Sequence, residues 1–159
     1  MYISTLDSPI GHMMIQANEL GVYAIKFPAE IPDEVPNHIS EQAKEQFKQY
    51  FEGKSSAFNF PMMQQGTDFQ QKVWDELRKI VAGKPITYTS LAKRLNNPLA
   101  IRAIASANGR NNLMIAVPCH RVIGVNGDLV GFSAGLWRKK WLLEHEVKMT
   151  QSGQSSLIL

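Results

Sequence analysis

Residues 89–107 have the sequence TSLAKRLNNPLAIRAIASA, which predicts two short helices joined by a tight turn. In the first, residues 89–95, the apolar side chains recur at helical spacing. The following Asn-Asn-Pro interrupts this pattern, and Asn97 and Pro98 suit the N-cap and the first position of a second helix over residues 98–107. Two short helices with this connection are typical of a helix-turn-helix, although any helical hairpin gives the same spacing.

The second predicted helix carries mostly small side chains. They leave little between the helix backbone and whatever lies against it, and they are Ala100, Ala103, Ala105, Ser106 and Ala107. Two interpretations fit, namely close packing inside a lobe and close approach to a DNA groove. Arg102 is the one long side chain expected to project from this helix, and a lone arginine on a helix is usually only solvated.

The charge of the surrounding sequence favours a polyanionic partner. Residues 77–127 contain no Asp or Glu and eight Lys or Arg, whereas the rest of the chain holds nine basic and 14 acidic residues. Positive charge gathered in one lobe raises the local potential and attracts nucleic acid. A solvated basic face without a partner fits the charge alone equally well.

The fold class expected from the whole chain is α+β, in two lobes and a tail. Residues 1–62 predict a scaffold lobe, in which a small antiparallel meander (residues 2–6, 13–17 and 22–27) precedes a helix over residues 40–51. Residues 67–147 predict a winged-helix-like lobe built on the helix-turn-helix. Residues 148–159 are expected to form a C-terminal tail that is frayed from Gln151 onward.

The second lobe has further predicted elements around the two short helices. A helix begins at Thr67 or Asp68, has an apolar face that includes Val81, and ends at Gly83. Residues 113–117 predict a buried strand, and Asn126-Gly127 predicts a hairpin between residues 122–125 and 129–132. A last helix over residues 135–146 is expected to turn Leu136, Trp137 and Trp141 toward the core.

The single cysteine, Cys119, excludes an internal disulfide and a zinc site built from cysteine clusters. We therefore expect no metal and no cofactor. A lone thiol suits a reducing cytosol, and the sequence has neither a signal-peptide pattern nor an apolar run of about 18 residues. These features predict a cytoplasmic protein.

Cys119 lies between a proline and a histidine, an arrangement that favours a reactive thiol. Pro118 stiffens the backbone, and His120 can accept the thiol proton directly or through a water. A buried structural cysteine beside a surface histidine is the commoner situation for an arbitrary Cys-His pair. Because neighbours in a strand point to opposite faces, the two can cooperate only if the chain turns there.

Several short motifs resemble one known family, the O6-alkylguanine-DNA alkyltransferases, also called methylated-DNA–protein-cysteine methyltransferases. The motifs occur in the family's order and spacing, and they are ITY (86–88), AIRA (100–103), ANGRN (107–111), PCHRVI (118–123) and WLLEHE (141–146). The resemblance runs from Phe69 to Glu146 and continues more weakly in residues 3–11 and 22–27.

The resemblance implies an irreversible, single-turnover transfer of an alkyl group from O6 of guanine in DNA to Cys119, with O4 of thymine as a further candidate substrate. His120 would deprotonate the thiol through a water, and Glu146 would orient His120. Asn111 would brace the active-site turn by hydrogen bonds. Tyr88 would donate its hydroxyl proton toward N3 of the leaving guanine.

The resemblance also implies how DNA is held. The target nucleotide must be flipped out of the duplex, and Arg102 would fill the vacated space while Ala103 and its small neighbours enter the minor groove. Tyr88 and Thr89 would lie near the flipped phosphate, and Ser133 near the guanine O6. The expected partner is double-stranded DNA containing O6-alkylguanine, bound by a monomer.

Two departures from the family pattern concern the pocket wall, and three other functions fit the sequence less well. Phe132 and Ala134 stand where many relatives have Tyr and Gly, which affects the size of the accepted alkyl group. A non-catalytic lesion sensor would lack Cys119. A thiol hydrolase leaves the basic helix-turn-helix unexplained, and a winged-helix transcription factor would not need Cys119, Glu146 or Tyr88.

Overall fold

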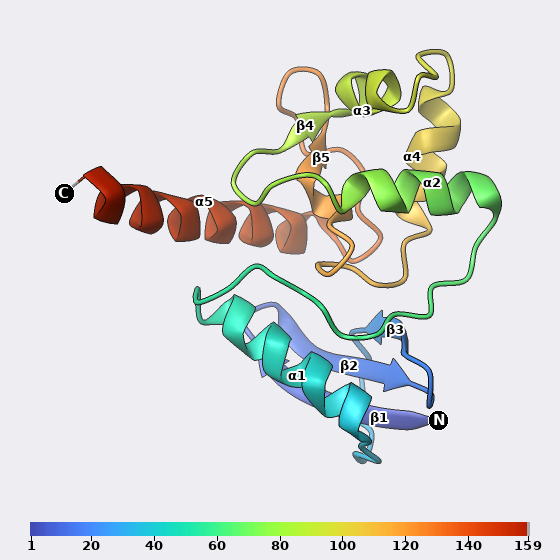
Figure 1. The fold of residues 1–159 in the computed structure, drawn as a ribbon, viewed down its shortest axis with the longest axis vertical. Helices are drawn as coiled ribbons and strands as arrows, with labels where there is room; N and C mark the ends of the chain where they lie inside the picture. Colours follow the sequence, from blue (N-terminus) through green and yellow to red (C-terminus); the bar gives the residue numbers. More distant parts are fainter. Residues whose placement is uncertain (159) are drawn as a thin grey trace. The chain divides into compact units, whose positions relative to one another are not determined.

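The computed structural model describes the backbone of residues 1–158 and the side chains of residues 1–151. The chain divides into two compact units, Met1–Gln65 and Gly66–Leu159 (Figure 1). Each unit combines helical structure with a small sheet, and the predicted α+β class is confirmed. No helix in the described part of the chain is both long enough and apolar enough to cross a membrane.

The first unit is the predicted meander with one helix. Strands β1 (Tyr2–Ser8), β2 (Gly11–Ala17) and β3 (Val22–Lys26) pair antiparallel in the order β1-β2-β3. Helix α1 (His38–Phe51) packs against the sheet and begins at an Asn37 cap that accepts the Ser40 N–H (Figure 1). The apolar core comes from the strands, α1 and the segment that follows it, and includes Ile10, Met13, Ile15, Val22, Ile39, Phe47, Tyr50 and Phe60.

The second unit is mainly helical. Its elements are α2 (Asp68–Leu77), β4 (Ile86–Thr87), α3 (Tyr88–Arg94), α4 (Ile101–Gly109), the 3₁₀ turn η1 (Cys119–Arg121), β5 (Val122–Ile123) and α5 (Leu136–Ile158). Helix α2 packs against α4 and η1. The buried Trp74 of α2 donates its indole N–H to the Ala107 carbonyl at 2.9 Å, which fixes α2 against the end of α4.

The two short helices are present, but the second begins later than the sequence predicts. Helix α3 ends at Arg94, and Asn96 adopts a left-handed conformation with φ 53°. Helix α4 starts at Ile101 rather than Pro98. The intervening residues form a turn that is closed by the Ala100 N–H donating to the Asn97 carbonyl at 3.1 Å. Asn97 therefore closes a turn instead of capping a helix.

Three other predicted elements differ from the structure. Helix α2 ends at Leu77, well before Gly83, and Val81 is 61% exposed on the turns that follow. Residues 113–117 form a buried loop rather than a strand, with Ile115 at φ 76°. Gly127 does form a turn, but the predicted hairpin is absent. Residues 129–132 form no strand, and β5 pairs with β4 in parallel.

Helix α5 continues through residues predicted as a tail. It continues past Glu146, because neither Gly nor Pro interrupts residues 136–152, and it extends to Ile158, while Leu159 lies outside the described residues. Its inward face also differs from the prediction, since Leu136 and Trp137 are 49% and 55% exposed. The buried positions are Lys139, Leu142 and Glu146, which are spaced as one helix face.

Candidate active site

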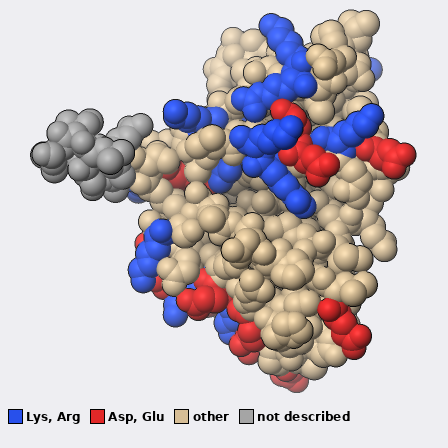
Figure 2. Space-filling view, in the orientation of Figure 1, with Lys and Arg blue, Asp and Glu red and all other residues tan. Residues whose placement is uncertain are grey.

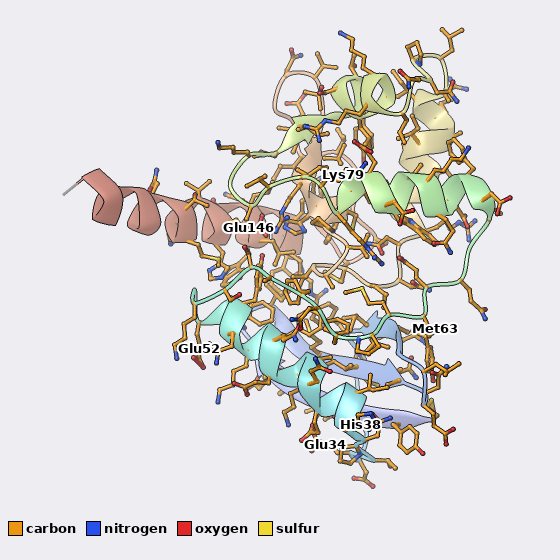
Figure 3. All side chains as sticks on the ribbon, viewed as in Figure 1. Glu34, His38, Glu52, Met63, Lys79 and Glu146 are labelled. Atoms are coloured by element: carbon orange, nitrogen blue, oxygen red, sulfur yellow. The ribbon has the colours of Figure 1, made fainter. Side chains whose placement is uncertain are left out.

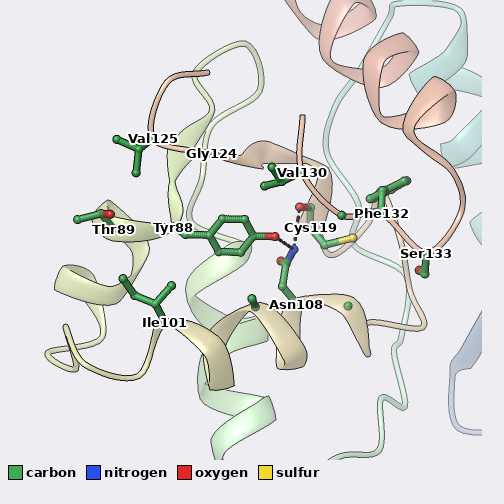
Figure 4. A pocket seen from close by; sticks show the side chains of 13 residues that line it. Tyr88, Thr89, Ile101, Asn108, Cys119, Gly124, Val125, Val130, Phe132 and Ser133 are labelled. Carbon is green, nitrogen blue, oxygen red and sulfur yellow. Dashed lines mark hydrogen bonds between the residues drawn. The ribbon is translucent and has the colours of Figure 1, made fainter. Parts of the chain in front are cut away.

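A cavity of about 640 Å³ opens in the second unit, between helices α3 and α4, η1 and residues 124–133 (Figure 4). Its lining brings together the predicted residues Tyr88, Thr89, Cys119 and Ser133. Phe132, one of the departures from the family pattern, also lines it. This volume and lining suit a small aromatic ligand such as a purine base.

Cys119 begins the 3₁₀ turn directly after Pro118 and is only 5% exposed. The chain does turn here, as cooperation with His120 requires. Burial raises the pKa of the Cys119 thiol to about 11, although Asn111 and Lys139 act in the opposite direction. The thiol is therefore protonated near neutral pH and needs a base when it attacks.

His120 and Glu146 form a fully buried pair, with His120 Nε2 and Glu146 Oε2 2.8 Å apart. Burial lowers the pKa of His120, and the neighbouring Glu146 only partly offsets this. Burial by itself would raise the pKa of Glu146, but His120 and Arg121 together hold it well below its ordinary value. Glu146 is therefore a carboxylate that accepts from Nε2–H, which leaves Nδ1 of the neutral imidazole as a proton acceptor.

The remaining ring nitrogen of His120, Nδ1, is buried and has no hydrogen-bond partner among the described residues. A buried polar atom without a partner is costly and calls for an explanation. A water between Nδ1 and the Cys119 thiol would satisfy it. Nδ1 is therefore the ring atom of His120 that remains available to accept a proton.

Arg121 is a site residue that the sequence analysis missed. Its guanidinium donates from Nε to Glu146 Oε1 at 2.8 Å and from Nη2 to Glu146 Oε2 at 2.9 Å. A third bond runs from Nη1 to the Ile80 carbonyl at 2.7 Å. Arg121 is thus buried and paired, whereas the other seven basic residues of residues 77–127 are exposed. No sequence signal marked its burial, because its partners Glu146 and the Ile80 carbonyl are 25 and 41 residues away along the chain.

Lys139 is a second missed residue. Its ammonium is buried and donates to the Val122 carbonyl at 2.7 Å and to the Val130 carbonyl at 3.0 Å. It thereby joins β5 to the loop that forms one wall of the cavity. Its position was predictable in principle, because it lies seven residues before Glu146 and so on the same helix face. Figure 3 labels Glu146 on this helix.

Asn111 fastens the loop that leads to the cysteine. Its Nδ2 donates to the Val117 carbonyl at 2.7 Å, and its Oδ1 accepts the Leu113 N–H at 3.0 Å. These two bonds bridge both ends of residues 113–117, which explains why this apolar run folds as a loop and not as a strand. The loop in turn positions Pro118 and Cys119.

Arg102 and Ala103 lie on the exposed face of α4. They are absent from the cavity lining, which instead takes Ile101 and Ala105 from the same helix. On the face shown in Figure 2, Lys and Arg side chains gather over the second unit, with fewer acidic ones among them. Helix α4 therefore presents Arg102 and Ala103 to solvent while Ile101 and Ala105 of the same helix line the cavity.

The buried Arg121–Glu146 pair leads to a stability prediction. Arg121→Met removes one partner and leaves the Glu146 carboxylate buried with less compensation, so we expect a loss of about 3–5 kcal/mol in the free energy of unfolding. Urea unfolding followed by tryptophan fluorescence measures it, since Trp74, Trp137 and Trp141 all belong to the second unit. The exposed Arg110→Met is the matched control, with an expected change within about 0.5 kcal/mol. Equal stability of the two variants would contradict the structural role of the pair.

A cysteine–histidine–glutamate cluster at a cavity beside a helix-turn-helix defines a class of DNA-directed protein with a nucleophilic thiol. Two family models match this chain. Residues 68–148 match the DNA binding domain of 6-O-methylguanine DNA methyltransferase, and residues 1–64 match the ribonuclease-like domain of the same protein. The chain belongs to the 6-O-methylguanine DNA methyltransferase family, as the motifs predict.

Individual relatives agree over nearly the whole chain. A methylated-DNA–protein-cysteine methyltransferase of Methanosarcina acetivorans is 40% identical over 153 residues, covering 92% of this chain and 98% of the relative. That of Haemophilus influenzae is 36% identical over 154 residues, covering 92% and 86%. A crystal structure of Mycobacterium tuberculosis OGT in complex with DNA is similar with a TM-score of 0.84 and 35% identity, covering 94% of each chain.

Proposed function

We propose that this protein repairs O6-alkylated guanine in DNA by moving the alkyl group onto Cys119, once per molecule. Family membership supplies the reaction class, because the relatives are methylated-DNA–protein-cysteine methyltransferases. The observation that carries the assignment is the position of the chain's only cysteine, which lines the cavity and is followed by the buried His120–Glu146 pair.

The proton of the thiol moves first. His120 Nδ1 takes it through a water, and Glu146 stabilises the imidazolium that forms. Because Arg121 already balances the charge of Glu146, the cluster is close to neutral before the reaction, and the lowered pKa of His120 keeps the imidazole unprotonated. The base is therefore in its accepting form at neutral pH.

The thiolate sulfur then attacks the alkyl carbon. A carbon–sulfur bond forms as the bond from carbon to O6 breaks, and the electron pair of that bond passes to the guanine. A proton delivered to N3 by the Tyr88 hydroxyl neutralises the leaving base. Tyr88 lines the same cavity as Cys119 and is within reach of a bound purine. The thioether left on Cys119 has no easy leaving group, so the protein is consumed.

DNA reaches this chemistry through base flipping. The exposed Arg102 on α4 fills the gap in the duplex, the exposed small residues Ala103 and Ser106 let the helix approach the minor groove, and the exposed basic residues bind phosphates. Thr89 and Ser133 contact the flipped nucleotide, at the backbone and near O6 respectively. The same attack on O4 of alkylated thymine, and a cytoplasmic location that keeps Cys119 reduced, are parts of the proposal.

Stoichiometry tests the proposal. With excess duplex carrying a radiolabelled O6-methyl group, label on the protein is expected to plateau at about one methyl per chain, because one nucleophile is available. An unmethylated duplex with free labelled methanol is the control and should give no label. Continued turnover with recovery of the free thiol would contradict the proposal and favour a thiol hydrolase.

A further inference from the structure

Asn108 lies between the two groups that the proposed reaction uses. It is on α4, is only 3% exposed, and lines the cavity together with Tyr88 and Cys119. Its Nδ2 is 3.1 Å from the Tyr88 hydroxyl oxygen and 3.3 Å from the Cys119 carbonyl oxygen (Figure 4). No role for this residue follows from the sequence alone.

The Cys119 carbonyl determines which way the Asn108 amide is turned. A carbonyl oxygen only accepts hydrogen bonds, so the amide atom that faces it must be the nitrogen. The amide nitrogen carries two hydrogens, one for each of its two partners. The Tyr88 oxygen is therefore an acceptor in this contact.

The direction of the Tyr88 hydroxyl hydrogen follows from this contact. Since the amide of Asn108 already donates to the phenolic oxygen, the hydroxyl hydrogen cannot point at Asn108 and is free to point into the cavity that Tyr88 lines. A hydroxyl that accepts one hydrogen bond is polarised and becomes a better donor in the next. We propose that Asn108 is a positioning residue that turns the Tyr88 hydroxyl into a proton donor for the bound purine.

The other amide atom supports a functional reason for this asparagine. Asn108 Oδ1 is fully buried and has no hydrogen-bond partner among the described residues. Leaving a buried acceptor unpaired costs stability, whereas an apolar side chain of similar shape would cost little. Asn108→Leu removes this unpaired acceptor, and the Cys119 carbonyl that loses the amide keeps the Val122 N–H as a donor, so the variant is expected to fold with about wild-type stability while losing the effect on Tyr88.

A double-mutant cycle tests the inference, which rests on the proposed function. The limiting single-turnover rate of methyl transfer and the half-saturating concentration are measured for the wild type, Asn108→Leu, Tyr88→Phe and the double variant. We expect Asn108→Leu to lower the limiting rate about tenfold, the worth of one hydrogen bond, with little change in half-saturation. In the Tyr88→Phe background the same substitution should have almost no further effect.

Asn108→Asp keeps the shape of the side chain but replaces the amide donor that faces the Tyr88 hydroxyl with a carboxylate acceptor. A carboxylate accepts the Tyr88 proton and turns it away from the cavity, so this variant should be slower than Asn108→Leu, and the difference should vanish in the Tyr88→Phe background. Thermal unfolding of every variant checks the fold. If Asn108→Leu does not fold, Asn108→Ala, which introduces no clash, takes its place.

A substrate lacking the accepting atom gives an independent readout. With 3-deaza-O6-methylguanine in the duplex, the wild type should react more slowly than it does with O6-methylguanine. On the 3-deaza substrate, Asn108→Leu should react no more slowly than the wild type. Equal slowing of Asn108→Leu on both substrates, additive with Tyr88→Phe, would overturn the inference and show that Asn108 acts through the Cys119 turn. Failure of the wild type on O6-methylguanine itself would instead refute the proposed function.

Discussion

Cys119→Ala is expected to abolish alkyl transfer completely while leaving binding to an O6-methylguanine duplex largely intact. The thiol supplies the nucleophile, whereas the exposed basic residues and α4 supply the binding surface, so the two activities separate. Transfer of label and duplex affinity, measured on the same preparation, check both parts.

The fold of this variant needs a control because Cys119 is buried. Removing one small thiol should change the free energy of unfolding only modestly, and far less than Arg121→Met does. Any transfer of label to the Cys119→Ala protein would contradict the assignment of the acceptor. Loss of duplex binding with an intact fold would show that the thiol also contributes to recognition.

Arg102→Ala is expected to slow reaction with duplex DNA far more than reaction with free O6-benzylguanine. The free base needs no flipping and so bypasses the step in which Arg102 fills the gap in the duplex. Flipping costs a few kcal/mol, so losing the residue that offsets this cost should slow the duplex reaction about a hundredfold. Arg102→Lys should rescue poorly, because lysine restores the charge but not the planar, stacking guanidinium.

Rates for Arg102→Ala and Arg102→Lys on both substrates, at two salt concentrations, distinguish flipping from a phosphate contact. A phosphate contact predicts good rescue by lysine and a defect that depends steeply on salt. Arg110→Ala, an exposed arginine at the end of the same helix, is the matched control. Equal slowing on duplex and free base would mean that Arg102 supports the fold or the pocket instead.

Much of the architecture could be predicted because it follows local rules. The meander of the first unit has alternating apolar runs separated by turn residues, and α1, α2 and α3 have clear apolar spacing and caps. The residues of the candidate site were predicted from the resemblance to the alkyltransferases, whose motifs run from residue 86 to residue 146. The structure brings Tyr88, Thr89, Cys119 and Ser133 into one cavity.

The errors arose where side-chain hydrogen bonds override the apolar pattern. Residues 113–117 are as apolar as a buried strand, but the side chain of Asn111 binds both ends and folds them into a loop. Arg121 looks like surface charge until Glu146 and the Ile80 carbonyl are placed around it. No single-sequence pattern reveals such pairings, since they depend on how α2 and α5 pack against η1.

The most direct test of the account is the intact mass of the protein after one reaction with an O6-methylguanine duplex, followed by mapping of the modified peptide. The account predicts that the whole population gains a single methyl group in place of a hydrogen, that the group lies on Cys119, and that the duplex is left with unmodified guanine. An unchanged protein mass with demethylated DNA, or a methyl group on any other residue, would contradict it.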